Sequence, residues 1–262
     1  MNFPLFDSHC HLQYPDLKNN LEEVLLRAKE AGVLEMLCCG TEESDWPLVQ
    51  ELARIHPQII IPSFGLHPWY IKNRSTVWLK NLEDFLKTMP SAVGEIGLDH
   101  SLADFNEQEQ NSVFISQLEL ANQLQRPVTI HCRKAWESLL KILKAIVPHC
   151  GGMIHSYSGS AELIPALEDY GLYLSFSGSV TRSGNKRGRK AIGTVSPERL
   201  LIETDSPDLL PAGLPDGTNE PANLIHVLKE GAALLHLREE EFALRTRENT
   251  KRFLKDIVHE SL

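Results

Sequence analysis

Six side chains of the types that bind metal ions follow short apolar runs at wide intervals along the chain. The six residues are His9, His11, Glu95, His131, His155 and Asp205. Four imidazoles and two carboxylates are enough ligands for two metal ions with open coordination positions. Imidazole suits zinc, iron, nickel or manganese better than magnesium, which prefers oxygen ligands. The residue types therefore predict a centre for two divalent ions.

Such a centre has a clear chemical use. Two ions about 3.5–4 Å apart can activate a water molecule and bind both oxygens of a displacement, and a central Glu95 can bridge them. This chemistry needs no serine or cysteine nucleophile. Cys10 and Cys132 are neighbours of predicted ligands, but neither has the separate base and orienting group of a thiol enzyme. The pattern predicts a hydrolase.

Each of these residues also has an ordinary explanation when it is taken alone. A single histidine near a strand end is usually a hydrogen-bonded structural residue, and an acidic residue after a strand often caps a helix. Six residues of this kind, all at strand ends, are harder to explain in this way. His9 and His11 are two residues apart, so on a strand they share one face while Cys10 points away from it.

The elements that must position these residues alternate along the whole chain. Eight β-rich runs are separated by amphipathic helical patterns. The predicted strands are Phe3–His9, Leu34–Gly40, Ile59–Gly65, Ala92–Leu98, Pro127–His131, Gly152–His155, Leu172–Ser177 and Leu200–Thr204. Glu95 and His131 are expected to end the fourth and fifth strands. Eight β–α units in about 250 residues are typical of a (β/α)8 TIM barrel, whose strand ends meet at one catalytic mouth.

A doubly wound open sheet would also alternate strands and helices. However, the chain has neither a GxGxxG sequence after its first strand nor a P-loop sequence. We therefore expect one TIM-barrel domain over residues 1–262. Two helix starts are visible: Asn106 with Glu109 resembles a capping box before a helix at about Glu107, and Asn219–Glu220–Pro221 resembles a cap with proline in the first turn.

Composition excludes several classes of protein. The 262 residues are 42% hydrophobic and 23% charged, which excludes a collagen, a coiled coil and a disordered chain. No apolar run is long enough for a membrane span, so we expect no membrane contact. The net charge of −9 means that any nucleic-acid contact must be local. Five cysteines without a CxxC pair indicate a reduced, cytoplasmic protein.

The ordered motifs resemble those of the TatD-type deoxyribonucleases, which are metal-dependent hydrolases of the amidohydrolase superfamily. The resemblance covers nearly the whole chain. The motifs that carry it are FDSHCHL around His9 and His11, VGEIGLD at 93–99, IHCR at 130–133, HSYSGS at 155–160, LLIETDSPDLLP at 200–211, NEP at 219–221 and NTKRFL at 249–254.

The resemblance implies a (β/α)8 barrel with a dinuclear centre. One ion would be held by His9, His11, Glu95 and Asp205, and Glu95 would also hold the second. His131 and His155 would complete the second site. Asp205 would handle the proton of the attacking water, so Asp205 and Glu95 are the predicted catalytic residues. The resemblance also implies DNA hydrolysis, often from 3′ ends of single strands. The identity of the two ions stays open among Zn, Mn, Mg, Ni and Fe.

Three rim positions depart from the family pattern. Lys134 replaces the usual aspartate after Arg133, Thr218 replaces the arginine usual before NEP, and His100 stands where an aromatic residue is common. These positions affect the choice of substrate. Asp99 either orients a ligand histidine or caps a turn.

Four residues are predicted to bind substrate: His67, Arg133, Asn219 and Glu220. Arg133 has the planar donor group that suits a phosphate, although a structural ion pair is the alternative. His67 is placed to donate to a phosphoryl oxygen or to cap a turn. Capping alone would also explain Glu220. Trp69 is either a base-stacking platform or part of the core.

One basic run extends from Arg182 to Lys190 in a loop after the seventh strand. It is either a local site for a polyanion or a solvated surface.

The main hypothesis is a metal-dependent deoxyribonuclease that acts on single-stranded DNA, as a 3′ exonuclease. A second hypothesis keeps the metals and changes the substrate to an ester or amide, such as a misacylated tRNA or a small metabolite. A third is a non-catalytic barrel that a metal stabilises and that binds a partner.

Overall fold

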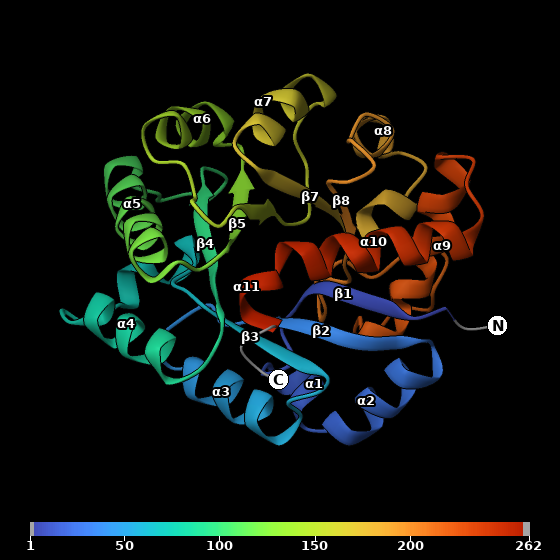
Figure 1. Cartoon of the computed structure of the whole chain (residues 1–262), viewed down its shortest axis with the longest axis horizontal. Helices are drawn as coiled ribbons and strands as arrows, with labels where there is room; N and C mark the ends of the chain where they lie inside the picture. Colours follow the sequence, from blue (N-terminus) through green and yellow to red (C-terminus); the bar gives the residue numbers. More distant parts are fainter. Residues whose placement is uncertain (1–2, 259–262) are drawn as a thin grey trace.

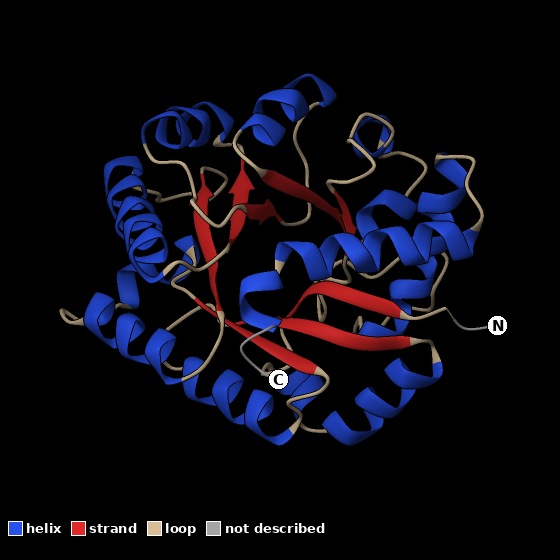
Figure 2. Cartoon of the chain, viewed as in Figure 1, coloured by secondary structure: helices blue, strands red, loops and turns tan. Residues whose placement is uncertain are grey.

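The computed structural model describes residues 3–258 and contains the predicted barrel. Within these residues, parallel strands form one eight-stranded sheet in the order β1 to β8. The strands run around a ring, and helices surround them on the outside (Figures 1 and 2). This arrangement confirms the (β/α)8 fold that the alternating pattern predicts.

The strands of the described part are β1 (Leu5–Cys10), β2 (Val33–Cys39), β3 (Ile60–Phe64), β4 (Ala92–Asp99), β5 (Val128–Arg133), β6 (Gly152–Ile154), β7 (Leu172–Phe176) and β8 (Leu200–Ile202). The α-helices are α1 (Pro15–Lys18), α2 (Leu21–Glu30), α3 (Trp46–Ile55), α4 (Trp78–Thr88), α5 (Glu107–Leu124), α6 (Trp136–Ala145), α7 (Ile164–Asp169), α8 (Lys186–Ile192), α9 (Leu224–Leu234), α10 (Glu239–Phe253) and α11 (Lys255–Val258). Four short 3-10 segments are η1 (Pro68–Asn73), η2 (Ala161–Leu163), η3 (Gly178–Thr181) and η4 (Pro221–Asn223).

Every predicted strand boundary lies within two residues of an observed one. The apolar runs predict the strands well because both faces of a parallel strand are covered, as in β4, where every residue is buried. One expectation about position is wrong. Glu95 lies in the middle of β4 and His131 lies two residues before the end of β5, because both strands continue past them to Asp99 and Arg133.

The two expected helix starts have different outcomes. The Asn106 side chain accepts a hydrogen bond from the backbone N–H of Glu109 at 3.1 Å, and α5 begins at Glu107 as predicted. The second start is a short 3-10 turn, η4, and α9 begins only at Leu224. Glu220 is the cap residue of η4 by its backbone, without a capping bond from its side chain.

The barrel closes between β1 and the segment that follows β8. The backbone N–H of Asp205 donates to the carbonyl of His9 at 3.0 Å, and the N–H of His11 donates to the carbonyl of Ser206 at 2.8 Å. The buried Asp7 carboxylate adds a bond of 2.9 Å from the N–H of Thr204. The first and last strands are therefore joined through the same residues that carry three predicted metal ligands.

Apolar side chains fill the opposite end of the barrel. A buried cluster inside the sheet includes Phe6, Leu201 and Tyr173, near the starts of their strands. Phe253 from α10 and Ile257 from α11 complete this cluster, and the two helices lie across this end of the barrel (Figure 1). The C-terminal helices thus cover the floor of the barrel, and the polar site lies at the other end. Within residues 3–258, no helix combines the length and the apolar character that crossing a bilayer requires.

Replacement of Gly97 by alanine should destabilise the protein and disturb His131. Gly97 has a φ of +145°, and a Cβ added there would lie 2.0 Å from the carbonyl oxygen of His131 on the neighbouring strand. Relief of this clash requires β4 and β5 to separate, so we expect a loss of about 3 kcal/mol or more in the free energy of unfolding. Urea unfolding followed by circular dichroism measures it.

Gly217→Ala is the matched control, because a Cβ at Gly217 meets nothing within 4 Å. This variant should unfold at nearly the same urea concentration as the wild type. Equal stability of the two variants would contradict the close packing of β4 against β5.

Candidate metal centre

The carboxylate of Glu95 lies at the centre of the histidine cluster, and its two oxygens face different groups. Oε2 lies 3.2 Å from Nε2 of His9 and 3.4 Å from Nε2 of His11. Oδ1 of Asp205 lies 3.7 Å and 3.6 Å from the same two nitrogen atoms. His9, His11 and Asp205 thus form one group around Oε2 of Glu95.

The other oxygen of Glu95 faces the second group. Oε1 lies 2.9 Å from Nδ1 of His131, 2.8 Å from Nε2 of His155 and 3.2 Å from Nε2 of His67. Because each oxygen has its own set of nitrogen neighbours, the carboxylate is placed between two clusters of donor atoms.

The donor set fits divalent ions. Within residues 3–258, three groups of residues have donor atoms within 4.8 Å of one another. These groups are His9, His11 and Asp205; His67, Glu95 and His131; and His9, His155 and Glu203. Imidazole nitrogens with a few carboxylate oxygens are the ligands that zinc, manganese, nickel and iron accept. The centre can therefore bind divalent metal ions.

The outer atoms of two histidine rings are fixed by further contacts. Nδ1 of His11 donates to the carbonyl of Cys39 at 2.8 Å, which leaves Nε2 facing Glu95. Nε2 of His131 lies 3.2 Å from Oδ2 of Asp99. Asp99 also accepts two hydrogen bonds from Ser101, so this carboxylate both orients a histidine and caps a turn. Such outer contacts hold metal-binding rings in place.

Burial and charge shift the pKa values of the cluster. Burial alone would raise the pKa of Glu95, but the surrounding histidines, first His155 and His67, hold it well below its usual value. Burial likewise opposes ionisation of Asp205, but His11 and its neighbours lower the pKa of Asp205. Burial lowers the pKa of His67 to about 4 despite Glu95. The two central carboxylates are therefore ionised at neutral pH, as metal ligands must be.

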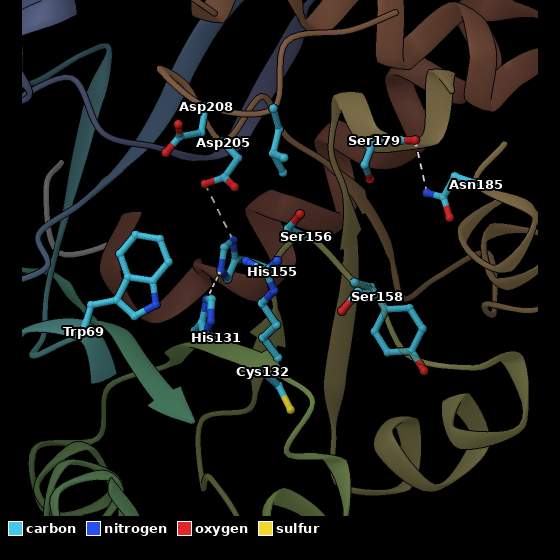
Figure 3. A pocket seen from close by; sticks show the side chains of 13 residues that line it. Trp69, His131, Cys132, His155, Ser156, Ser158, Ser179, Asn185, Asp205 and Asp208 are labelled. Atoms are coloured by element: carbon cyan, nitrogen blue, oxygen red, sulfur yellow. Dashed lines mark hydrogen bonds and ion pairs between the residues drawn. The ribbon is translucent and has the colours of Figure 1, made fainter. Parts of the chain in front are cut away.

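The centre opens into a cavity of about 480 Å³. The cavity is lined by His131, His155 and Asp205 on the side of the centre and by Arg133 and serine hydroxyls elsewhere. In Figure 3, His155 and His131 lie below Asp205, with Ser156 and Ser158 to one side, and dashed lines join the two histidines and join His155 to Asp205. A ligand in this cavity would lie against side chains of the candidate centre.

The four predicted substrate-binding residues lie in different environments. Arg133 is exposed and lines the cavity. His67 is buried inside the histidine cluster, and its Nε2 lies 3.2 Å from Oε1 of Glu95. It therefore belongs to the centre and not to the exposed edge of the cavity. Substrate contacts by these residues stay predictions.

Asn219 and Glu220 use their side chains in contacts within the protein. The buried Asn219 amide donates to the carbonyls of Thr204 and Asp208 at 2.9 and 2.7 Å, on either side of Asp205. Glu220 accepts hydrogen bonds from Arg27 of α2, the shortest at 2.6 Å. These contacts hold the loop after β8, and a contact of either residue with substrate stays a prediction.

The basic run from Arg182 to Lys190 is partly a surface with ion pairs and partly a set of exposed cations. Arg189 is paired with Glu230, and Lys190 lies 2.7 Å from Glu162. Arg182, Lys186 and Arg187 are exposed. Part of the run is therefore a surface with ion pairs, and its other cations face solvent.

Sequence reasoning missed Glu203 as a member of the site. Its Oε1 accepts the N–H of Ser156 at 2.6 Å and lies 3.5 Å from Nδ1 of His155. Its Oε2 is buried and has no hydrogen-bond partner among the described residues. The available signal was a carboxylate directly after the apolar run of β8, two residues before Asp205 and therefore of the same strand parity.

Comparison with known proteins agrees with this architecture. The family model described as TatD related DNase matches residues 6–255. The metal-dependent hydrolase YabD of Bacillus subtilis is 33% identical over 96% of this chain and 99% of its own length. The 3′-5′ ssDNA/RNA exonuclease TatD of Pantoea ananatis is 33% identical over 87% of this chain and 90% of its own length.

Solved structures show the same similarity. The crystal structure of YjjV, a TatD homologue of Escherichia coli K12, superposes with a TM-score of 0.90 at 30% identity and covers 95% of this chain and 97% of that one. With a metal-ligating cluster at one end of a TIM barrel and a family match over nearly its whole length, the chain belongs to the TatD-related DNase family of metal-dependent hydrolases.

Proposed function

We propose that the protein is a deoxyribonuclease that hydrolyses phosphodiester bonds of single-stranded DNA, from the 3′ end, with two divalent ions. The observation that carries the proposal is the division of the Glu95 oxygens between two groups of donors beside an open cavity. The exposed guanidinium of Arg133 in that cavity suits a phosphate. The printed activity of the Pantoea relative, a single-strand exonuclease, supports the same substrate.

In this proposal the whole chain works as one hydrolase domain, and each group of donors holds one ion. His9, His11 and Asp205 would hold the first ion with Oε2 of Glu95. His131 and His155 would hold the second with Oε1. Divalent ions bound in this way supply two kinds of chemistry, since they lower the pKa of water and neutralise charge on phosphoryl oxygens.

The side chains have separate tasks in the reaction. Asp205 is ionised, and its carboxylate is about one-eighth exposed toward the cavity, so it can accept the proton of the attacking water. Arg133 donates to the non-bridging oxygens of the bound phosphate and holds the diester in position. His67 and Asp99 keep the imidazole of His131 in place, the first by ring contact and the second by its carboxylate.

The number of bound ions is open to direct measurement. The wild type should bind two ions per chain, and His131→Asn should bind one, because the variant loses a nitrogen ligand at one of the two groups only. Free metal at a hundredfold excess over Kd adds about 2.7 kcal/mol of stability for each bound ion, and each such increment raises Tm by roughly 5–10 °C. Elemental analysis and calorimetry of both proteins, with zinc, manganese or magnesium, provide the test. One ion per wild-type chain would refute the two-ion arrangement.

The Asp205→Asn variant tests the proton acceptor. The amide has the same shape but cannot take a proton, so kcat on a single-stranded oligonucleotide should fall at least about a hundredfold. A time course on a labelled oligonucleotide gives kcat and KM and shows the polarity of degradation.

Asp208→Asn removes the same charge three residues away and should keep activity within about tenfold. If Asp205→Asn stays as active as this control, Asp205 is not the proton acceptor. If the wild type loaded with metal degrades neither DNA nor RNA but cleaves carboxylic esters, the nuclease proposal fails.

A further inference from the structure

Trp69 is an exposed aromatic ring beside the candidate centre. It belongs to η1, two residues after His67, and 49% of its surface is exposed. The other three tryptophans of the chain are buried or partly buried. A core position would hide the indole from water, so packing in the core does not explain this residue.

The exposed ring is nevertheless held firmly. Its Nε1–H donates to Oδ2 of Asp99 at 2.7 Å, and Oδ2 is the same oxygen that lies near His131. The indole also meets the ring of His67 edge to face, with centroids 5.2 Å apart and an angle of 86° between the planes. An indole fixed at its edge loses little conformational freedom when a ligand covers its face.

The indole also borders the space where substrate would lie. Trp69 lines the cavity together with His131 and Asp205. Figure 3 shows it on one side of the two labelled histidines, with Ser158 and Asn185 on the other side. A group that stacks on the indole would therefore sit next to the reacting phosphate.

We propose that Trp69 binds the nucleobase of the nucleotide next to the scissile phosphate, an inference that rests on the nuclease function proposed above. A flat aromatic base matches the indole face, and base–aromatic stacking contributes about 1–3 kcal/mol per base in single-strand binding. The stack depends little on base identity, since every base has a flat π-face. Arg133 supplies the charge for the phosphate, so the two residues read different parts of one nucleotide.

Two variants separate stacking from the contact with Asp99. Trp69→Phe keeps an aromatic face but loses the N–H donor, and Trp69→Leu loses both. The substrates are two single-stranded oligonucleotides that differ only in the terminal nucleotide, which carries adenine in one and is abasic in the other. If kcat changes by the same factor in both variants relative to the wild type, the cause is the loss of the hydrogen bond from the indole N–H to Asp99.

The difference between the two substrates reports the stack. For the wild type and Trp69→Phe, KM should be about tenfold lower on the adenine substrate than on the abasic one. For Trp69→Leu the two KM values should become equal. A Trp69→Leu variant that still prefers the adenine substrate as strongly as the wild type does would overturn the inference.

A binding measurement without turnover separates this inference from the proposed function. Deoxyadenosine monophosphate should quench the tryptophan fluorescence of the metal-free wild type, and deoxyribose 5-phosphate should not. Trp69→Phe retains the other three tryptophans and should show no quenching. Quenching in a protein that cleaves no nucleic acid would refute the nuclease activity and leave the base site standing. DNA cleavage without quenching, and with equal KM values in the wild type, would refute the base site alone.

Discussion

The burial of the Glu95 carboxylate among five histidines is the constraint on which the site depends. A buried carboxylate stays ionised only where positive charge or hydrogen-bond donors surround it. In this protein the histidines with raised pKa values are His11 after β1, His131 on β5 and His155 after β6. No local segment can supply those neighbours. The closed barrel brings them together, and its apolar floor, completed by Phe253 and Ile257, keeps water from the other end. Fold and chemistry are therefore linked through one charged group.

The centre and the rim differ in how firmly they are built. The histidines of the candidate centre are fixed by the strands and by contacts such as that of His11 with the Cys39 carbonyl. The loop after β8 is fixed by hydrogen bonds within the protein. Asn219 donates to the carbonyls of Thr204 and Asp208, and Glu220 accepts from Arg27. Arg133 and the exposed part of the basic run face solvent instead. His100, Lys134 and Thr218, where the sequence departs from the family pattern, are not among the donor groups of the centre in the described part of the chain.

Much of the architecture follows from local patterns, and the rest depends on distant contacts. Apolar runs predict all eight strands because buried parallel strands are apolar on both faces. The six candidate ligands could be predicted from the sequence because residues of their types are rare at successive strand ends. The position of Glu95 in the middle of β4 could not be predicted, because a strand that continues into polar residues has no local signal for its end. The inward position of His67 and the site contacts of Glu203 depend on neighbours more than 25 residues away in sequence. The bond between Glu220 and Arg27 joins residues that no periodicity relates.

The hydrogen bonds between the end of β1 and the segment after β8 also join parts of the chain that are synthesised at very different times. His9 and His11 leave the ribosome early. Their backbone partners, Asp205 for His9 and Ser206 for His11, are made much later, and Asp205 follows His9 by 196 residues. At typical rates of translation this interval is roughly 10–40 s. Until then β1 lacks the backbone partners that it has after β8 in the folded chain. The complete set of donors thus requires a chain made at least as far as Asp205, and metal binding by the whole set requires a barrel that has already closed.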